Sequence, residues 1–304
     1  MTSLRARLIN LALPLLGIKS FMSEPDRMEE RLEKARKRKP QRPNAKWRKK
    51  FDIVEEAGRG YPVVTITPRD VPAAGAPHLL YLHGGGYVLD IVSQHFDTVC
   101  RLCEQLGASA TVPIYPLAPE HEAPQVLAAM RALYDDVIAR HDAGSVTVMG
   151  DSAGGGMSLA LAQMLRSDGG TLPGSLVLWS PWLDATASAE GQAAIEPSDR
   201  MLAQVGLVKC AELYGGGLPA EDPRLSPLFG ALDGLPPTAI FAGTRDILIV
   251  DARRLAARFR DAGKTDFEFH EYEGMFHVWM LMPFPESNRA LAQTAAFIRQ
   301  ANAR

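Results

Sequence analysis

The chain has 304 residues and a formal net charge of −2; 46% of its residues are hydrophobic and 22% are charged. This composition is typical of a soluble globular protein that is long enough to enclose a core. The longest uncharged apolar stretch, residues 8–18, falls short of the roughly 20 residues that a membrane-spanning helix needs, which excludes an integral membrane protein. Three cysteines in such a chain make no disulfide framework, so disulfide-scaffold folds are excluded and we expect a cytoplasmic location.

Residues 1–50 form a basic leader with 15 Lys and Arg against 5 Asp and Glu, whereas residues 51–304 carry 18 against 30. We expect the leader to be helical and to dock on the acidic body. Arg5 and Arg7 followed by an apolar run imitate a secretory signal, but no small-x-small cleavage site follows, so we expect the segment to stay attached. Because basic runs also bind anionic lipid or nucleic acid, a peripheral membrane contact through residues 1–50 is the alternative. We expect no nucleic-acid partner, and a homodimer stays open.

From residue 51 onward, short β-branched runs alternate with longer amphipathic stretches, which predicts an α/β fold with a mostly parallel sheet of eight strands flanked by helices. The first two strands are joined by a turn without a helix, so we expect that end of the sheet to be antiparallel. The expected strands are 51–56, 62–67, 78–83, 109–114, 145–150, 175–180, 238–242 and 266–272. The expected helices are 96–106, 123–140, 153–166, 250–262 and 286–300.

One interval breaks this alternation. Between the sixth and the seventh expected strands lie more than fifty residues with little β character. A connection of that length inside a compact domain usually has a function. We therefore expect a helical insertion over residues 184–225, which together with residues 1–50 makes a helical cap over a catalytic domain of residues 51–304.

The sequence Gly150-Asp151-Ser152-Ala153-Gly154 follows an apolar strand and begins a helix. In that setting, a G-x-S-x-G match predicts a sharp strand-to-helix turn that exposes the serine hydroxyl above the sheet. The start of the helix also brings the Ala153 N–H beside that hydroxyl. We expect Ser152 to be a catalytic nucleophile, with a glycine-rich packing turn as the alternative.

His83-Gly84-Gly85-Gly86-Tyr87 follows an earlier strand. Consecutive glycines let backbone amides approach a ligand without side chains in the way. Rigid amides of this kind stabilise the oxyanion of a tetrahedral intermediate, so Gly85 and Gly86 are candidate donors, with Ala153 as the third. A phosphate-binding loop is the alternative, but the Lys-Ser/Thr of a P-loop and the G-x-G-x-x-G of a dinucleotide fold are both missing.

A serine nucleophile needs a base, and the base needs a carboxylate that orients it. His277 follows the last expected strand and Asp246 follows the strand before it, so both belong to the same edge of the sheet as Ser152. The chain order Ser, Asp, His is that of α/β-hydrolases. Asp251 is the rival carboxylate, although we expect it inside the next helix. We expect activity to fall at acid pH as His277 protonates, near the usual histidine pKa of about 6.5.

The remaining candidates have smaller roles. Cys100 and Cys103 lie on one expected helix without a second cysteine pair or a histidine cluster, so we expect no metal site. Tyr87, Val88 and Phe276 adjoin the motifs and are candidate walls of a substrate pocket. Among the other histidines, we expect His83 to fix the glycine loop and His95 to cap or support a neighbouring helix. Four more are expected at the surface or at strand ends, namely His78, His121, His141 and His270.

Taken together, these motifs resemble the bacterial branch of the hormone-sensitive-lipase family of α/β-hydrolases. The resemblance covers roughly residues 50–304 and rests on residues 83–86, 115–120, 150–155, 180–184, 222–228, Asp246 and 274–277. It implies carboxylic-ester hydrolysis without a cofactor, a cap formed by the N-terminal segment and the later insertion, and short to medium acyl chains. Two features depart from the family pattern, namely Pro116 in place of a frequent arginine and the unusually basic leader.

We therefore interpret the chain as a serine carboxylesterase that acts on a small-molecule ester through a Ser152–His277–Asp246 triad and an acyl-enzyme. A lactonase would use the same machinery on a cyclic ester. A ligand-binding protein built on an inactive hydrolase is the third interpretation, and the plant gibberellin receptor resembles such a case. Loss of the catalytic base would indicate such an inactive protein, whereas this sequence contains all three predicted triad residues.

Overall fold

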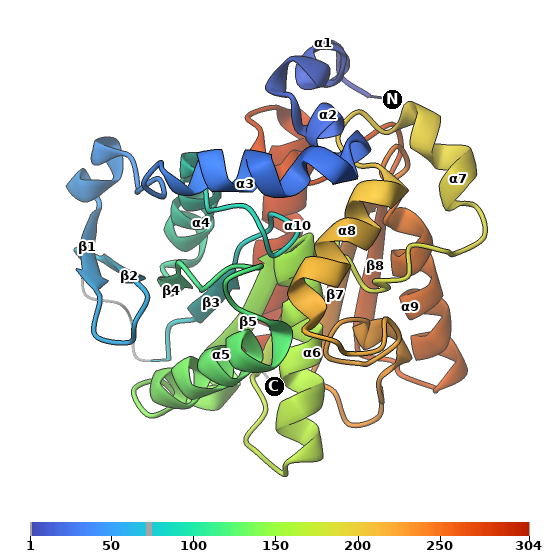
Figure 1. Cartoon of the computed structure of the whole chain (residues 1–304). Coiled ribbons are helices and arrows are strands. Elements are labelled where there is room, and N and C mark those ends of the chain that lie inside the picture. Colours follow the sequence, from blue (N-terminus) through green and yellow to red (C-terminus); the bar gives the residue numbers. More distant parts are fainter. Residues whose placement is uncertain (1, 71–74, 304) are drawn as a thin grey trace.

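The computed structural model describes residues 2–70 and 75–303 and has an eight-stranded sheet at its centre (Figure 1). The strand order is β1-β2-β4-β3-β5-β6-β7-β8, and all pairs from β4 to β8 are parallel. The first two strands are antiparallel as expected, and β2 is also antiparallel to β4. The strands are β1 (Phe51–Glu56), β2 (Val63–Pro68), β3 (His78–Leu82), β4 (Ser109–Pro113), β5 (Val146–Asp151), β6 (Ser175–Trp179), β7 (Thr238–Gly243) and β8 (Phe267–Tyr272).

Helices cover both faces of the sheet. On one face α4 contacts α10, and elsewhere α5 contacts α6, which lies against β3, β5 and β6. These helices are α4 (Ser93–Leu106), α5 (Ala123–Ile138), α6 (Ala153–Ser167), α9 (Ile249–Asp261) and α10 (Pro285–Asn302). Every residue of β3, β5, β6 and β7 is buried, as expected for parallel strands covered on both sides. The core therefore lies around the strands that precede the sequence motifs.

Helix α4 begins at Ser93, three residues before the expected start at residue 96. The difference has a local cause, because the His95 ring accepts a hydrogen bond from the Val92 N–H at 3.0 Å and so caps the first turn. Side-chain caps of this kind satisfy N–H groups that have no partner inside the helix. The hydrophobic periodicity alone does not reveal this extra turn.

A second layer of helices lies above one edge of the sheet (Figure 1). It contains two segments far apart in sequence, and α2 of the leader packs against α8 of the insertion. Gly206 of α8 is required at this contact, since a Cβ there would lie 2.2 Å from the Met22 carbonyl oxygen. The helices of this layer are α1 (Leu4–Ala12), α2 (Ile18–Ser23), α3 (Met28–Arg36), α7 (Gln192–Ile195) and α8 (Gln204–Gly215), with a 3-10 turn, η1 (Leu13–Leu16), after α1.

The basic run of the leader docks on acidic side chains of the body. Trp47 fixes the contact by donating its ring N–H to Asp97 at 2.5 Å. Each exposed ion pair contributes between about 0 and 1 kcal/mol, so the set positions the leader more than it stabilises the fold. The pairs are Arg36–Glu120 at 3.2 Å, Arg42–Glu55 at 2.6 Å, Lys46–Asp97 at 3.1 Å, and Lys50–Glu104. Within residues 2–70 and 75–303, none of the helices combines the length and apolarity needed to cross a bilayer.

Candidate active site

Ser152 sits between the end of β5 and the start of α6, with φ at 53° and ψ at −121°. A non-glycine residue in this region is strained and is held by its surroundings. Glycines make the turn possible, because a Cβ on Gly150 would lie 2.4 Å from the Leu82 carbonyl oxygen, and one on Gly154 would lie 2.0 Å from the same atom. The predicted sharp turn is present, and 7% of Ser152 is exposed to solvent.

The structure brings the three predicted triad residues together. His277 Nε2 lies 2.9 Å from Ser152 Oγ, and His277 Nδ1 lies 2.8 Å from Asp246 Oδ2. The other oxygen of Asp246 accepts the Leu248 N–H at 2.9 Å, so both oxygens of this buried carboxylate are bonded. The arrangement is a continuous hydrogen-bonded chain from a carboxylate through an imidazole to a hydroxyl.

Two adjacent loops hold His277 and Asp246 in this position. The loop after β8 contacts the loop after β7, because the Arg245 N–H donates a hydrogen bond to the Met275 carbonyl at 2.9 Å. The Gly274 N–H donates to Thr244 Oγ1 at 2.7 Å, which ties the same two loops a second time. Hydrogen bonds between the loops that follow two neighbouring strands therefore hold two of the predicted triad residues in position.

The charge environment favours the protonated form of His277. Burial alone would lower the pKa of this imidazole, but the charge of Asp246 and its hydrogen bond outweigh burial and raise the pKa above its usual 6.5. Asp199 adds to the same effect. The pKa of His277 is thus raised from the value of about 6.5 that we expected from the sequence, because the charges of two carboxylates reach the buried ring.

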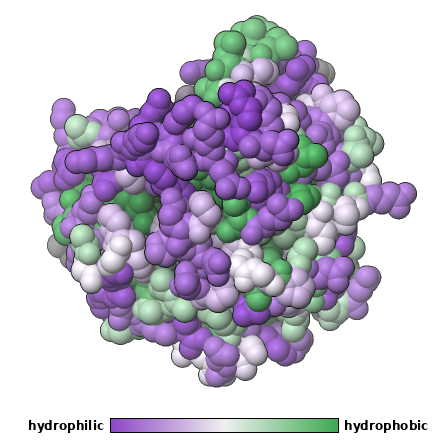
Figure 2. All heavy atoms as spheres, viewed as in Figure 1, coloured by the Kyte–Doolittle hydropathy of each residue, from purple (hydrophilic) through white to green (hydrophobic). Residues whose placement is uncertain are grey.

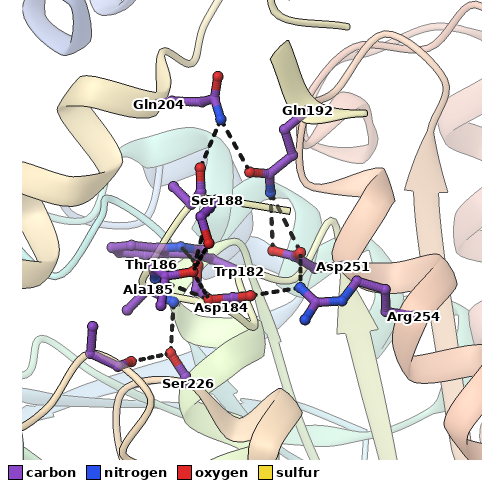
Figure 3. A network of polar contacts seen from close by, with 12 residues as sticks. Trp182, Asp184, Ala185, Thr186, Ser188, Gln192, Gln204, Ser226, Asp251 and Arg254 are labelled. Atoms are coloured by element: carbon purple, nitrogen blue, oxygen red, sulfur yellow. Dashed lines mark hydrogen bonds and ion pairs between the residues drawn. The ribbon is translucent and has the colours of Figure 1, made fainter. Parts of the chain in front are cut away.

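The rival carboxylate, Asp251, lies inside α9 and faces other partners (Figure 3). Arg254 contacts Asp251 at 3.2 Å and Asp184 at 2.6 Å, and Gln192 of α7 lies 3.4 Å from both oxygens of Asp251. Burial and the charge of Asp184 raise the pKa of Asp251 to about 8. The network ties the insertion to α9.

The glycine loop has the conformation that only glycine adopts readily. Gly85 has φ at 125° and Gly86 at 61°. In the part of the chain that the structure describes, neither of their N–H groups has a hydrogen-bond partner. A Cβ on Gly86 would lie 3.2 Å from Cys210 Sγ, so α8 lies directly over the loop. Two rigid amides without partners are thus available beside α8.

His83 and Tyr115 pack together at the start of this loop and support it. Their rings stack with centroids 4.1 Å apart, and the Tyr115 hydroxyl donates to the His83 carbonyl at 2.6 Å. His83 Nδ1 lies 2.6 Å from the Gly84 carbonyl oxygen. Burial lowers the pKa of His83 to about 3, which keeps the ring neutral. These contacts agree with the predicted supporting role.

Sequence reasoning missed the role of Asp151, the residue before Ser152. Its Oδ1 accepts the Gly84 N–H at 2.9 Å and the Tyr81 hydroxyl, and His95 Nε2 lies 3.5 Å from its Oδ2. Burial would raise the pKa of Asp151, but its interaction with His95 and the hydrogen bond from Tyr81 outweigh burial and lower it. Asp151 thus joins the nucleophile turn to the glycine loop. Its place inside the G-x-S-x-G motif was the available signal.

Asp199, from the insertion, was also missed. Its Oδ1 accepts the N–H groups of Met201 and Leu202, each at 2.8 Å, and its Oδ2 accepts the Ile247 N–H at 3.0 Å. Because Ile247 follows Asp246, this carboxylate links the insertion to the triad loop. Burial and the charge of Asp246 raise the pKa of Asp199 to about 6. No motif surrounds Asp199, so the sequence held no signal for it.

Tyr87, Val88 and Phe276, the candidate pocket walls, are all buried. Tyr87 stacks on Tyr214 of α8 with ring centroids 3.9 Å apart, while Phe276 packs on Phe284. Their contact with substrate stays a prediction.

Two other predicted features have structural outcomes. His78 begins β3 as a strand-end residue, but it is buried, bonded to Ser109 at 2.7 Å and stacked on His141, so the surface alternative is wrong for it. Burial lowers the pKa of His78 to about 3.

Cys100 and Cys103 are buried free thiols. Among the described residues, His, Cys, Asp and Glu side chains form no group of three or more suited to a metal ion.

Comparison with known proteins places this geometry in a family. A family model described as the alpha/beta hydrolase fold matches residues 79–281. The chain is 34% identical over 243 residues to a triacylglycerol lipase of Mycobacterium tuberculosis and 35% identical over 226 residues to an acetyl-hydrolase of Streptomyces hygroscopicus. These alignments cover 78% and 73% of this chain. The chain spans 50% of the lipase and 75% of the acetyl-hydrolase.

The solved structures agree with the sequence relatives. An esterase from the bacterial hormone-sensitive lipase family superposes with a TM-score of 0.84 at 27% identity, covering 99% of each chain. The fold expected from the motifs is thus confirmed. The chain belongs to the alpha/beta hydrolase family and, within it, to the hormone-sensitive-lipase group of carboxylic-ester hydrolases.

Proposed function

We propose that this protein is a serine carboxylesterase in which Ser152 is the nucleophile, His277 the general base and acid, and Asp246 the residue that orients the imidazole. The observation that supports this most directly is the chain of hydrogen bonds of 2.8 and 2.9 Å from Asp246 through His277 to Ser152. Three loops that follow different strands converge on it. Such convergence is difficult to explain as packing alone, because it aligns a hydroxyl, an imidazole and a carboxylate in the order that nucleophilic catalysis needs.

In the acylation step, Ser152 Oγ attacks the ester carbonyl carbon while His277 Nε2 takes the hydroxyl proton. The carbonyl oxygen becomes an oxyanion, which the N–H groups of Gly85, Gly86 and Ala153 stabilise. Each such donor is worth about 3 kcal/mol of transition-state stabilisation. Asp246 keeps the proton on Nδ1 and balances the positive charge of the imidazolium.

When the tetrahedral intermediate collapses, the bond to the alkoxy oxygen breaks and His277 gives its proton to the departing alcohol. A water molecule then attacks the acyl-enzyme carbonyl as His277 removes its proton. The second intermediate collapses with the proton returning to Ser152 Oγ, which releases the carboxylic acid. Proton transfer by a positioned histidine contributes on the order of 10² to 10⁴ in rate.

We propose small-molecule esters with short to medium acyl chains as the substrates. The similarity to an acetyl-hydrolase supports a short acyl group. A limit on size is supported by the buried, stacked rings of Tyr87 and Tyr214, since Tyr87 directly follows the glycine loop. We further propose that residues 1–50 and the insertion form one cap over this site, since α2 and α8 pack together and Cys210 lies against Gly86.

The experiment that tests the function compares the wild type with Ser152→Ala on p-nitrophenyl acetate, butyrate, hexanoate and octanoate. We expect Ser152→Ala to lose hydrolysis of all four esters and to lose labelling by a fluorophosphonate. Ser167→Ala, at the exposed far end of α6, is the matched control and should keep wild-type turnover. Full turnover by Ser152→Ala would show that another residue is the nucleophile.

A further inference from the structure

Most of the large hydrophobic side chains that the described chain leaves exposed lie in one short segment. Of nine such side chains, five are leucines of α1 and η1, and they are between 57% and 88% exposed. Figure 2 shows apolar atoms gathered where α1 projects from the molecule. Contiguous exposed apolar surface on a soluble protein indicates a binding surface. The leucine face consists of Leu4, Leu8, Leu11, Leu15 and Leu16.

The leucine face lies on the outside of a two-sided helix. Four of its members, Leu4, Leu8, Leu11 and Leu15, follow one another at spacings of four and three residues and so form one stripe. The opposite stripe is Ala6, Asn10 and Leu13, and all three of these are buried against the rest of the protein. A surface helix normally turns its polar side to water. Here the inner face is already packed, and the outer face is apolar.

The charges beside the leucine face indicate the kind of partner. Residues 2–23 contain three cations and no acidic residue. Arg5 and Arg7 are exposed, and neither forms an ion pair within the described residues, whereas Arg36 and Lys46 pair with acids of the body. An apolar stripe flanked by unpaired arginines matches a bilayer with anionic headgroups. A second copy fits less well, because two such faces would bring like charges together.

The segment is fixed to the catalytic domain near the candidate site. The Ser3 N–H and hydroxyl donate to the Glu286 carboxylate at 2.5 and 2.9 Å. The Thr2 hydroxyl donates to the carbonyl of Glu273, which begins the loop that carries His277. Lys19 contacts the Leu202 carbonyl of the insertion. The leucine face is therefore held rigidly beside the helices that cover the site.

We propose that the leucine face and its two arginines form a docking surface for anionic lipid bilayers. Insertion of the leucines would hold the helices that cover Ser152 next to the membrane. Esters that partition into lipid would then reach the enzyme from the bilayer. The docking surface itself does not depend on the proposed catalytic roles.

The test is co-sedimentation of the full chain with vesicles of phosphatidylcholine, with and without phosphatidylglycerol. We expect the wild type to bind the vesicles that contain phosphatidylglycerol, more weakly as salt rises. Changing Leu4, Leu8, Leu11 and Leu15 together to Gln should lower the partition coefficient by at least roughly tenfold, because several leucines leave the bilayer. Val54→Gln is the matched control, because Val54 is 54% exposed on the edge strand β1 and lies outside the leucine face.

A second variant keeps the test decisive if the four glutamines disturb folding. Arg5→Gln with Arg7→Gln alters only exposed side chains and should weaken binding to phosphatidylglycerol vesicles by roughly fivefold per arginine. Hydrolysis of soluble p-nitrophenyl acetate should be unchanged in both variants, which separates this outcome from the Ser152 test. No binding by the wild type would overturn the proposal. A wild-type dimer that the glutamine variant converts to a monomer, without vesicle binding, would assign the face to a second copy instead.

Discussion

In the proposed triad, the protonation state of His277 decides whether Ser152 can be activated. Its buried imidazole faces Asp246 directly, and the charge of Asp199 reaches it as well, so its pKa is raised. Only the neutral ring accepts the Ser152 proton. Because a raised pKa keeps the ring protonated to a higher pH, activity should be lost on acidification at a pH above the ordinary histidine value.

We therefore predict that Asp246→Asn moves the acid limb of the kcat/KM profile to lower pH. The substitution removes the largest contribution that raises the pKa of His277, and it also favours the wrong tautomer, so kcat should fall on the order of 10⁴. The measurement is the pH dependence of hydrolysis of a short ester.

Asp251→Asn serves as the comparison, because that carboxylate faces Arg254 and Gln192. We expect it to leave the midpoint of the acid limb where it is in the wild type. A greater loss of activity in Asp251→Asn than in Asp246→Asn would mean that the wrong carboxylate has been assigned to the triad.

Among the helices, the contact between α2 and α8 joins the leader to the insertion. It depends on Gly206, where a single Cβ would meet backbone atoms of Met22. Helix α8 in turn places Cys210 over Gly86 and Tyr214 on Tyr87. A displacement at one end of this contact is thus expected to reach the glycine loop.

We predict that Gly206→Ala separates α2 from α8 and lowers the free energy of unfolding by about 1 to 3 kcal/mol, because the added carbon overpacks the contact. The kcat/KM for esters with longer acyl chains should fall more than that for the acetate ester. Each methylene that loses its apolar contact costs roughly 0.8 kcal/mol of binding free energy, or about fourfold in kcat/KM. Urea unfolding and the series of four esters measure both effects. Gly58→Ala is the control, because a Cβ there meets no atom within 4 Å. Equal behaviour of the two variants would contradict this role of the contact.

The sequence predicted the central strands and the triad because local signals mark them. Four consecutive apolar residues end β6, and Ser152, Asp246 and His277 each follow a strand. Asp199 was not predictable, because its role depends on a contact with Ile247 that only the folded chain creates. The start of α4 was missed for a similar reason, since the His95 side chain sets it.

Across the whole molecule, the opposite charges of the leader and the body are largely brought into contact. The basic residues nearest to β1 pair with acids on β1 and α4, so positive charges of the leader are neutralised locally by acids of the body. The sequence predicts that the leader docks on the body, but the individual pairs depend on the fold, because Arg36 and Glu120, for example, lie 84 positions apart. Within the described residues, Arg5 and Arg7 at the start of the leader form no ion pair, unlike Arg36 and Arg42.

The position of β8 at the end of the sheet has a consequence for how the enzyme loses activity. The loop of His277 follows β8, which is an edge strand of the described sheet and pairs with β7, whereas Ser152 follows β5 at the centre. Edge strands open locally at a lower free energy than the global transition. With increasing urea, ester hydrolysis should therefore vanish before the far-UV circular dichroism signal does, and amide hydrogens of β8 should exchange faster than those of β5. Coincident transitions with uniform exchange would show that the edge is as stable as the centre, and that this enzyme cannot be inactivated without unfolding it completely.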